Sequence, residues 1–177
     1  MKLKIDNVTL ELVQGDIVRQ NDLEAIVNAA NAQLKIGGGV AGAVHRAAGP
    51  GLEKECEPLA PIQVGEAVIT GGHNLPNEYV IHTLGPVYGV DKPEAELLNK
   101  SYKNSLEIAE ENEIESIGFP AISTGAFGYP IKEAAEISLK TVKDNADRLK
   151  NLKLIRFVLY SNSDFEVYKE KANKIFE

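Results

Sequence analysis

The sequence has few of the residues that build disulfides and metal centres. Its 177 residues include one cysteine, three histidines and no tryptophan. Because Cys56 is alone, no disulfide can form within the chain, and no zinc-type ligand spacing surrounds it. We therefore expect no disulfide framework, no metal site and no redox cofactor, and the cytoplasm is the expected compartment.

Long apolar runs are also missing. The N-terminal segment carries charges at Lys2, Lys4, Asp6 and Glu11, so it lacks the continuous apolar core of a secretory signal. No stretch approaches the roughly 20 apolar residues that cross a bilayer. The sequence thus predicts neither secretion nor a membrane partner.

An excess of positive charge is the third absence. The formal net charge is −7 at pH 7, whereas broad affinity for DNA or RNA depends on Lys and Arg that displace phosphate counterions. Nucleic acid is therefore not an expected partner. Any phosphate bound here must be held by backbone amides and helix ends.

The segments that are present alternate between strand and helix character. The composition is 44% hydrophobic and 25% charged, as in ordinary globular proteins, and residues 1–177 are predicted to form one domain. The expected strands are Val8–Val13, Ala25–Val27, Ala67–Thr70, Tyr79–His82, Ile114–Phe119 and Leu154–Tyr160. The expected helices are Val40–Ala48, Glu94–Asn112, Ile131–Leu149 and Asp164–Phe176. This order predicts an α/β fold, a three-layer α/β/α sandwich around a mixed, mostly parallel sheet of about six strands.

Two glycine-rich stretches follow predicted strands and precede predicted helices. The first runs from Gly37 to Gly42, and the second from Pro120 to Pro130. Glycine lets the backbone approach a ligand closely, and the helix N-terminus behind each stretch attracts anions. In an open α/β sheet such loops gather at the carboxyl ends of the strands. Together they predict a nucleotide or phosphate site.

Other nucleotide and nucleophile motifs fit less well. The first stretch satisfies G-x-G-x-x-G, but it lies too far behind its strand for a dinucleotide fingerprint, and no P-loop string occurs. Ser123 lacks a nucleophile elbow, and the histidines show no triad spacing. Neighbouring glutamates disfavour a Cys56 thiolate. Asp16 is either a turn cap or an acceptor for a base amino group.

Five motifs taken together resemble the macro domain family in order and spacing. They are Gly15 to Ile17, Ala25 to Asn31, Gly37 to Gly49, His82 to Pro86 and Phe119 to Pro130. The resemblance spans nearly the whole chain. It implies a mixed sheet between helices and, as partner, ADP-ribose or an ADP-ribosylated protein.

The resemblance also implies roles for individual residues. Asp16 would bind the adenine amino group beside the Ile17 amide, and Tyr160 would stack on adenine. Asn31 would meet the distal ribose, while Asn28 would brace the loop through its backbone. The diphosphate and distal ribose would lie between Gly38, Gly39, Val40 and Ala41 on one side and Ser123, Thr124, Gly125, Ala126 and Phe127 on the other.

The catalytic expectation depends on one departure from the family pattern. Hydrolytic members often resemble Gly-Gly-Val-Asp-Gly in the first loop, with an aspartate that activates water, whereas this chain has Ala41, which cannot act as a base. Members with alanine there are associated with hydrolysis of ADP-ribosyl esters on Glu or Asp, with a water positioned by Asn31. The alternatives are an ADP-ribose 1''-phosphate phosphatase, an O-acetyl-ADP-ribose deacetylase and a poly(A) or RNA binder. The sequence leaves the oligomeric state open.

Overall fold

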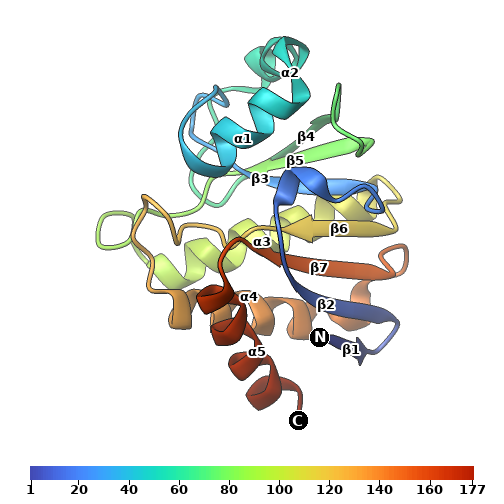
Figure 1. Cartoon of the computed structure of the whole chain (residues 1–177). Helices are drawn as coiled ribbons and strands as arrows, with labels where there is room; N and C mark the ends of the chain where they lie inside the picture. Colours follow the sequence, from blue (N-terminus) through green and yellow to red (C-terminus); the bar gives the residue numbers. More distant parts are fainter.

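The computed structural model describes residues 1–177 as one seven-stranded sheet with helices on both faces (Figure 1). The strands are β1 (Lys2–Ile5), β2 (Val8–Gln14), β3 (Ala25–Ala29), β4 (Ala67–Gly71), β5 (Tyr79–Thr83), β6 (Ser116–Phe119) and β7 (Leu154–Leu159). The helices are α1 (Gly39–Ala48), α2 (Pro50–Cys56), α3 (Glu94–Glu111), α4 (Ile131–Asn145) and α5 (Asn162–Phe176). Short 3₁₀ turns form at η1 (Ile17–Arg19), η2 (Glu57–Leu59) and η3 (Ala146–Arg148).

The sheet order is β1-β2-β7-β6-β3-β5-β4. Neighbouring strands from β2 to β5 run parallel, and β1 and β4 pair antiparallel at the two edges. The predicted α/β class with a mixed, mostly parallel sheet is therefore confirmed. The sheet has seven strands where about six were predicted, and the additional one is β1, a four-residue edge strand whose side chains are at most partly buried.

Each face of the sheet is covered by its own group of helices (Figure 1). Helices α3, α4 and α5 pack on one face, and α1 and α2 pack on the other. In β3, Ala25 and Val27 point to the first core, whereas Ile26 points to the second, which is the period of two that a strand imposes. The first core holds 26 buried residues and the second 13, so most hydrophobic stabilisation lies on the α3 side.

An aromatic cluster in the larger core reaches the end of β6. The rings of Tyr102 and Phe119 lie 5.2 Å apart, and those of Phe119 and Phe157 lie 5.6 Å apart. The Tyr102 hydroxyl donates to the Pro120 carbonyl (3.3 Å) and accepts from the Ile122 N–H (3.0 Å). The core thus fixes the backbone from which the second glycine loop departs.

Several predicted boundaries differ from the structure. The strand expected over 114–119 begins at Ser116, and the one expected over 154–160 ends at Leu159. The helix expected over 131–149 ends at Asn145, where η3 follows. The last helix begins at Asn162 rather than Asp164, because Ser161 caps it by accepting the Asp164 N–H. None of the helices is long and apolar enough to cross a membrane.

Candidate functional site

The carboxyl ends of the parallel strands meet at one edge of the sheet. The segments that leave this edge follow β2, β7, β6, β3 and β5, in that spatial order. They include Gly15 and Asp16 after β2, Tyr160 after β7, and the two glycine loops after β6 and β3. The edge therefore collects nearly all residues that the sequence singled out.

The two glycine loops form opposite walls of a cleft of about 270 Å³. Its lining residues are Ala29, Ala30, Asn31, Gly37, Gly38, Gly39, Val40, Ala41, Gly85, Ala121, Ile122, Ser123, Gly125, Ala126 and Phe127. Nine predicted residues meet here: Asn31, Gly38, Gly39, Val40, Ala41, Ser123, Gly125, Ala126 and Phe127. The other five, Asp16, Ile17, Asn28, Thr124 and Tyr160, do not line this cleft.

The Asn31 side chain closes the turn that leads into the first wall of the cleft. Its side-chain oxygen accepts the Lys35 N–H (3.1 Å), and its nitrogen donates to the Lys35 carbonyl (2.8 Å). The chain then enters α1 through Gly38, which supplies no side-chain cap, and Gly39, whose φ is +54°. The first N–H groups of α1 are therefore free to bind an anion.

The second wall contains a buried hydroxyl that has no partner. Ser123 is 6% exposed with φ of +67°, and its Oγ makes no hydrogen bond. Thr124 instead directs its hydroxyl to the Ala121 carbonyl (2.8 Å). A Cβ at Gly85 would lie 2.2 Å from the Ser123 Oγ, so only glycine fits behind this loop. A buried, unpaired hydroxyl in a cleft wall is expected to bind a ligand.

Asp16 and Tyr160 follow the carboxyl ends of the neighbouring strands β2 and β7, and neither lines the cleft. Gln14 pairs with Leu159, and the Gly15 N–H donates to the Leu159 carbonyl (2.9 Å). Asp16 caps η1 by accepting the Val18 N–H at 3.1 Å. Ile17 is buried, whereas Tyr160 is 84% exposed. An exposed aromatic ring and a carboxylate that follow neighbouring strands suit a flat base that also donates a hydrogen bond.

Asn28 lies beneath the cleft in a buried polar rung across three strands. Its amide nitrogen lies 3.0 Å from His82 Nδ1, and His82 Nε2 lies 2.8 Å from Thr70 Oγ1. Burial, together with nearby His45, lowers the pKa of His82 to about 3. The neutral ring can accept from Asn28 and donate to Thr70. Sequence reasoning missed this pairing, which rests on the register of β3 and β5.

The lone cysteine is poorly suited to nucleophilic chemistry. Burial, and secondarily the charges of Glu55 and Glu53, raise the pKa of Cys56 to about 11. The neighbouring charges predicted from the sequence thus act in the expected direction, but burial is the larger cause. No group of three or more His, Cys, Asp or Glu residues could hold a metal ion.

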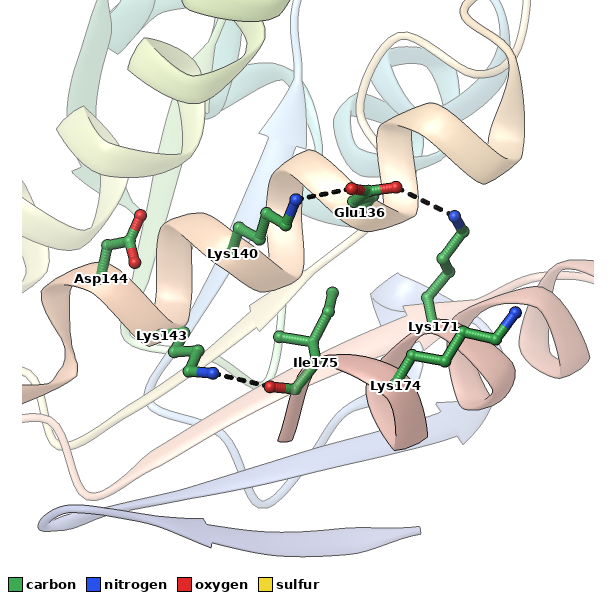
Figure 2. A pocket seen from close by; sticks show the side chains of 7 residues that line it. All are labelled: Glu136, Lys140, Lys143, Asp144, Lys171, Lys174 and Ile175. Atoms are coloured by element: carbon green, nitrogen blue, oxygen red, sulfur yellow. Dashed lines mark hydrogen bonds and ion pairs between the residues drawn. The ribbon is translucent and has the colours of Figure 1, made fainter. Parts of the chain in front are cut away.

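A larger hollow of about 490 Å³ lies between α4 and α5, as Figure 2 shows. Glu136 accepts from Lys140 (2.6 Å) and Lys171 (3.0 Å), and Lys143 donates to the Ile175 carbonyl (2.7 Å). The fourth lysine there, Lys174, pairs with Glu170. Because each ammonium group already has a partner and no glycine loop reaches the hollow, we place the candidate site in the smaller cleft.

Comparison with known proteins agrees with this placement. The Macro domain family profile matches residues 27–138. A structure of the Oceanobacillus iheyensis macrodomain with ADP is 42% identical, with a TM-score of 0.95 over 99% of this chain and 96% of that one. The Trypanosoma brucei macrodomain in complex with ADP-ribose is 37% identical, with a TM-score of 0.85 over 91% and 68%.

A curated relative from Salmonella typhimurium carries the name O-acetyl-ADP-ribose deacetylase. It is 48% identical over 164 residues, which cover 90% of this chain and 91% of the relative. The motifs, the sheet, the cleft and these similarities all agree. The chain belongs to the macro domain family.

Proposed function

We propose that this protein binds ADP-ribose, free or as the terminal unit on a protein, in the cleft between its glycine loops. The observation that carries the proposal is the pair of facing walls, with the open N-terminus of α1 on one side and the unpaired Ser123 hydroxyl on the other. Backbone amides can hold a diphosphate without lysine or arginine, which suits a chain of net charge −7.

The order of the loops along the sheet edge suggests which way round the ligand would lie. Asp16 and Tyr160 would hold adenine beyond the β6 side of the cleft, and the diphosphate would run between the loops. The distal ribose would then lie over Asn31 and Phe127. A ligand with a base, a diphosphate and a second sugar has a group for each of these three positions, whereas a mononucleotide lacks the second sugar.

We further propose that the cleft hydrolyses esters between the distal ribose and a carboxylate. Water would cleave such an ester to ADP-ribose and a free carboxylic acid. A carboxylate has a low pKa and leaves without help from a general acid. The lining set contains neither histidine nor a carboxylate, so Asn31 would position the water and a bond with a good leaving group is the one that this cleft can break.

O-acetyl-ADP-ribose is also a carboxylate ester, but in it the water attacks the acetyl carbonyl carbon, the bond to the ribose oxygen breaks, and that oxygen takes up a proton as acetate is released. The ribose hydroxyl is a poorer leaving group than a carboxylate, so this step demands more of the cleft. The Salmonella relative's name favours this substrate as the second candidate. Product analysis separates the candidates, since a modified protein releases ADP-ribose and its free side chain, while O-acetyl-ADP-ribose releases acetate. Inorganic phosphate released from ADP-ribose 1''-phosphate would instead identify a phosphatase.

The binding proposal is tested by isothermal titration of ADP-ribose into the wild type and Asp16→Asn, with AMP and NAD as controls. We expect micromolar or tighter binding, about −8 kcal/mol, by the wild type. Asparagine caps a helix as well as aspartate, so the variant keeps its stability. It loses one acceptor for the adenine amino group, so Kd should rise at least about tenfold. Absence of heat with the wild type would refute the proposal.

The hydrolytic proposal is tested with a glutamate-linked ADP-ribosyl protein and Ala41→Asp. We expect slow ester cleavage by the wild type. A positioned general base typically contributes about 10²–10⁴-fold to a rate. A carboxylate introduced into the cleft wall should therefore raise the rate of ester cleavage at least about tenfold. If the wild type binds ADP-ribose but leaves the ester intact, the protein is a binding module only.

A further inference from the structure

The large hydrophobic side chains that remain exposed are concentrated at the functional edge. They are Ile36, Leu59, Tyr88, Val90 and Tyr160. All but Leu59 lie in segments that follow the carboxyl ends of β3, β5 and β7. With Tyr160 proposed for adenine, Ile36, Tyr88 and Val90 have no role in the nucleotide site. We name these three residues the distal rim.

The part of the distal rim after β5 is an ordered turn. The Val87 N–H donates to the Asp91 carboxylate (2.8 Å), and the Val87 carbonyl accepts from the N–H groups of Val90 (3.1 Å) and Asp91 (3.0 Å). Val90 is nevertheless 71% exposed. The turn therefore holds an apolar side chain in water in a fixed position, which lowers the entropy cost of binding a partner there.

This turn is attached directly to the wall of the cleft. The Tyr88 N–H donates to the Phe127 carbonyl (2.9 Å), and the Tyr88 ring meets the Tyr129 ring edge to face at 4.9 Å. Ile36 precedes Gly37, which lines the opposite wall. The distal rim is therefore attached to both loops of the cleft, Ile36 to the first and Tyr88 to the second.

The strand order places the distal rim at the end of the cleft opposite to adenine. Adenine is assigned to β2 and β7, the diphosphate to the loops of β6 and β3, and β5 comes next along the sheet. Whatever is bonded to the distal ribose leaves the cleft on this side. In an ADP-ribosylated protein, that group is the polypeptide.

We infer that the distal rim is a docking surface for the acceptor polypeptide, which contacts Ile36, Tyr88 and Val90 through apolar side chains next to the ADP-ribosylated residue. The inference rests on the proposed function. It names the protein-linked form as the preferred ligand. A chain of net charge −7 also disfavours acceptors whose modified residue lies in a strongly acidic stretch.

The test compares two ligands on the wild type, Val90→Ser, Tyr88→Ser and the control Leu59→Ser. Leu59 and Tyr88 are similarly exposed, at 37% and 39%, but Leu59 lies in η2, outside the segments that directly follow the carboxyl ends of the parallel strands. The ligands are free ADP-ribose and a serine-linked ADP-ribosyl protein, whose glycosidic bond is harder to cleave than an ester. Each ligand displaces a fluorescent ADP-ribose, which gives both Kd values under the same conditions.

We expect Val90→Ser to raise Kd for the ADP-ribosyl protein about tenfold, the effect of removing one buried aliphatic side chain. In the same variant, Kd for free ADP-ribose should stay within about twofold of the wild-type value. In Leu59→Ser, Kd for each of the two ligands should stay within about twofold of the wild-type value. Equal Kd values for the ADP-ribosyl protein in wild type, Val90→Ser and Tyr88→Ser would overturn the inference. So would an equal loss for both ligands. Failure of the wild type to bind free ADP-ribose would instead refute the proposed function itself.

Discussion

At the scale of the residue, the polar rung of Asn28, His82 and Thr70 shows how a buried network supports a cleft that it does not line. Asn28 and His82 are fully buried and bonded to each other at 3.0 Å. Asn28 stands directly before Ala29, Ala30 and Asn31, which do line the cleft. The rung therefore holds the end of β3 at the point where the first loop departs.

His82 gives this rung a pH dependence with a definite sign. Its folded pKa of about 3 lies below the ordinary 6.5, so the unfolded chain binds the proton more readily. Its stabilisation is complete above about pH 6.5 and falls, by up to about 1.4 kcal/mol per pH unit, as pH drops towards 3. Urea unfolding between about pH 7.5 and 5 measures this slope.

The matched variants for this measurement are His82→Asn and His82→Gln. Neither titrates, so the slope should flatten in both, leaving the part due to His45, whose pKa burial also lowers. Asparagine places its amide where Nδ1 meets Asn28, whereas glutamine reaches towards Thr70. We expect tighter ADP-ribose binding by His82→Asn than by His82→Gln. A slope identical to wild type in both variants would contradict the role of His82.

At the scale of the element, α1 and the first loop depend on a close backbone approach. A Cβ at Gly42, inside α1, would lie 2.3 Å from the Gly37 carbonyl oxygen. Alanine normally stabilises a helix interior relative to glycine. Here it would push the loop away from the helix. In the second loop, a Cβ at Gly125 meets no atom within 4 Å, although Gly125 lines the cleft.

These two glycines predict different effects of the same substitution on stability, although both variants should bind ADP-ribose more weakly. Gly42→Ala should lower the free energy of unfolding by about 1–3 kcal/mol through overpacking, and should weaken ADP-ribose binding with it. Gly125→Ala should leave stability within about 0.5 kcal/mol while its methyl group obstructs the ligand. Chemical denaturation and titration calorimetry on both proteins check this. A stable Gly42→Ala with intact binding would show that the loop can move without cost.

At the scale of the whole molecule, the residues that line the cleft are uncharged, although the protein as a whole is acidic. The four lysines between α4 and α5 are paired and lie outside the cleft (Figure 2). Affinity should therefore come from amides and stacking rather than from counterion release. This distinguishes ADP-ribose binding from RNA binding, whose affinity falls steeply with salt.

We expect Kd for ADP-ribose to change by less than about threefold between roughly 50 and 200 mM salt, where nucleic-acid complexes with several phosphate contacts lose about 10³-fold or more. At 100 times Kd, the ligand should stabilise the fold by about 2.7 kcal/mol, raising Tm by roughly 5–10 °C. Thermal unfolding with and without ADP-ribose at both salt concentrations measures the two effects. A steep salt dependence would favour the RNA-binding alternative.

The sequence by itself determined the alternation of strands and helices, the α/β class and the positions of both glycine loops. These features are local, because periods of two and 3.6 residues and runs of glycine are readable in a short window. Boundaries such as Ser116, Asn145 and Leu159 were less accurate, since they depend on capping and pairing partners. The edge strand β1 alternates polar and apolar residues, but it was missed because it is only four residues long and none of its side chains is fully buried.

Only the tertiary structure decided which of these features work together. Asn28 pairs with His82, which lies far away in the sequence. Burial of the Ser123 hydroxyl without a hydrogen-bond partner and the order of the loops along the sheet edge likewise depend on segments far apart in the chain. So does the hydrogen bond from Tyr88 to Phe127, which attaches the Val87–Asp91 turn to a loop that lines the cleft. Such relations follow from strand order and register, and these are set by how all the hydrophobic faces are buried at once.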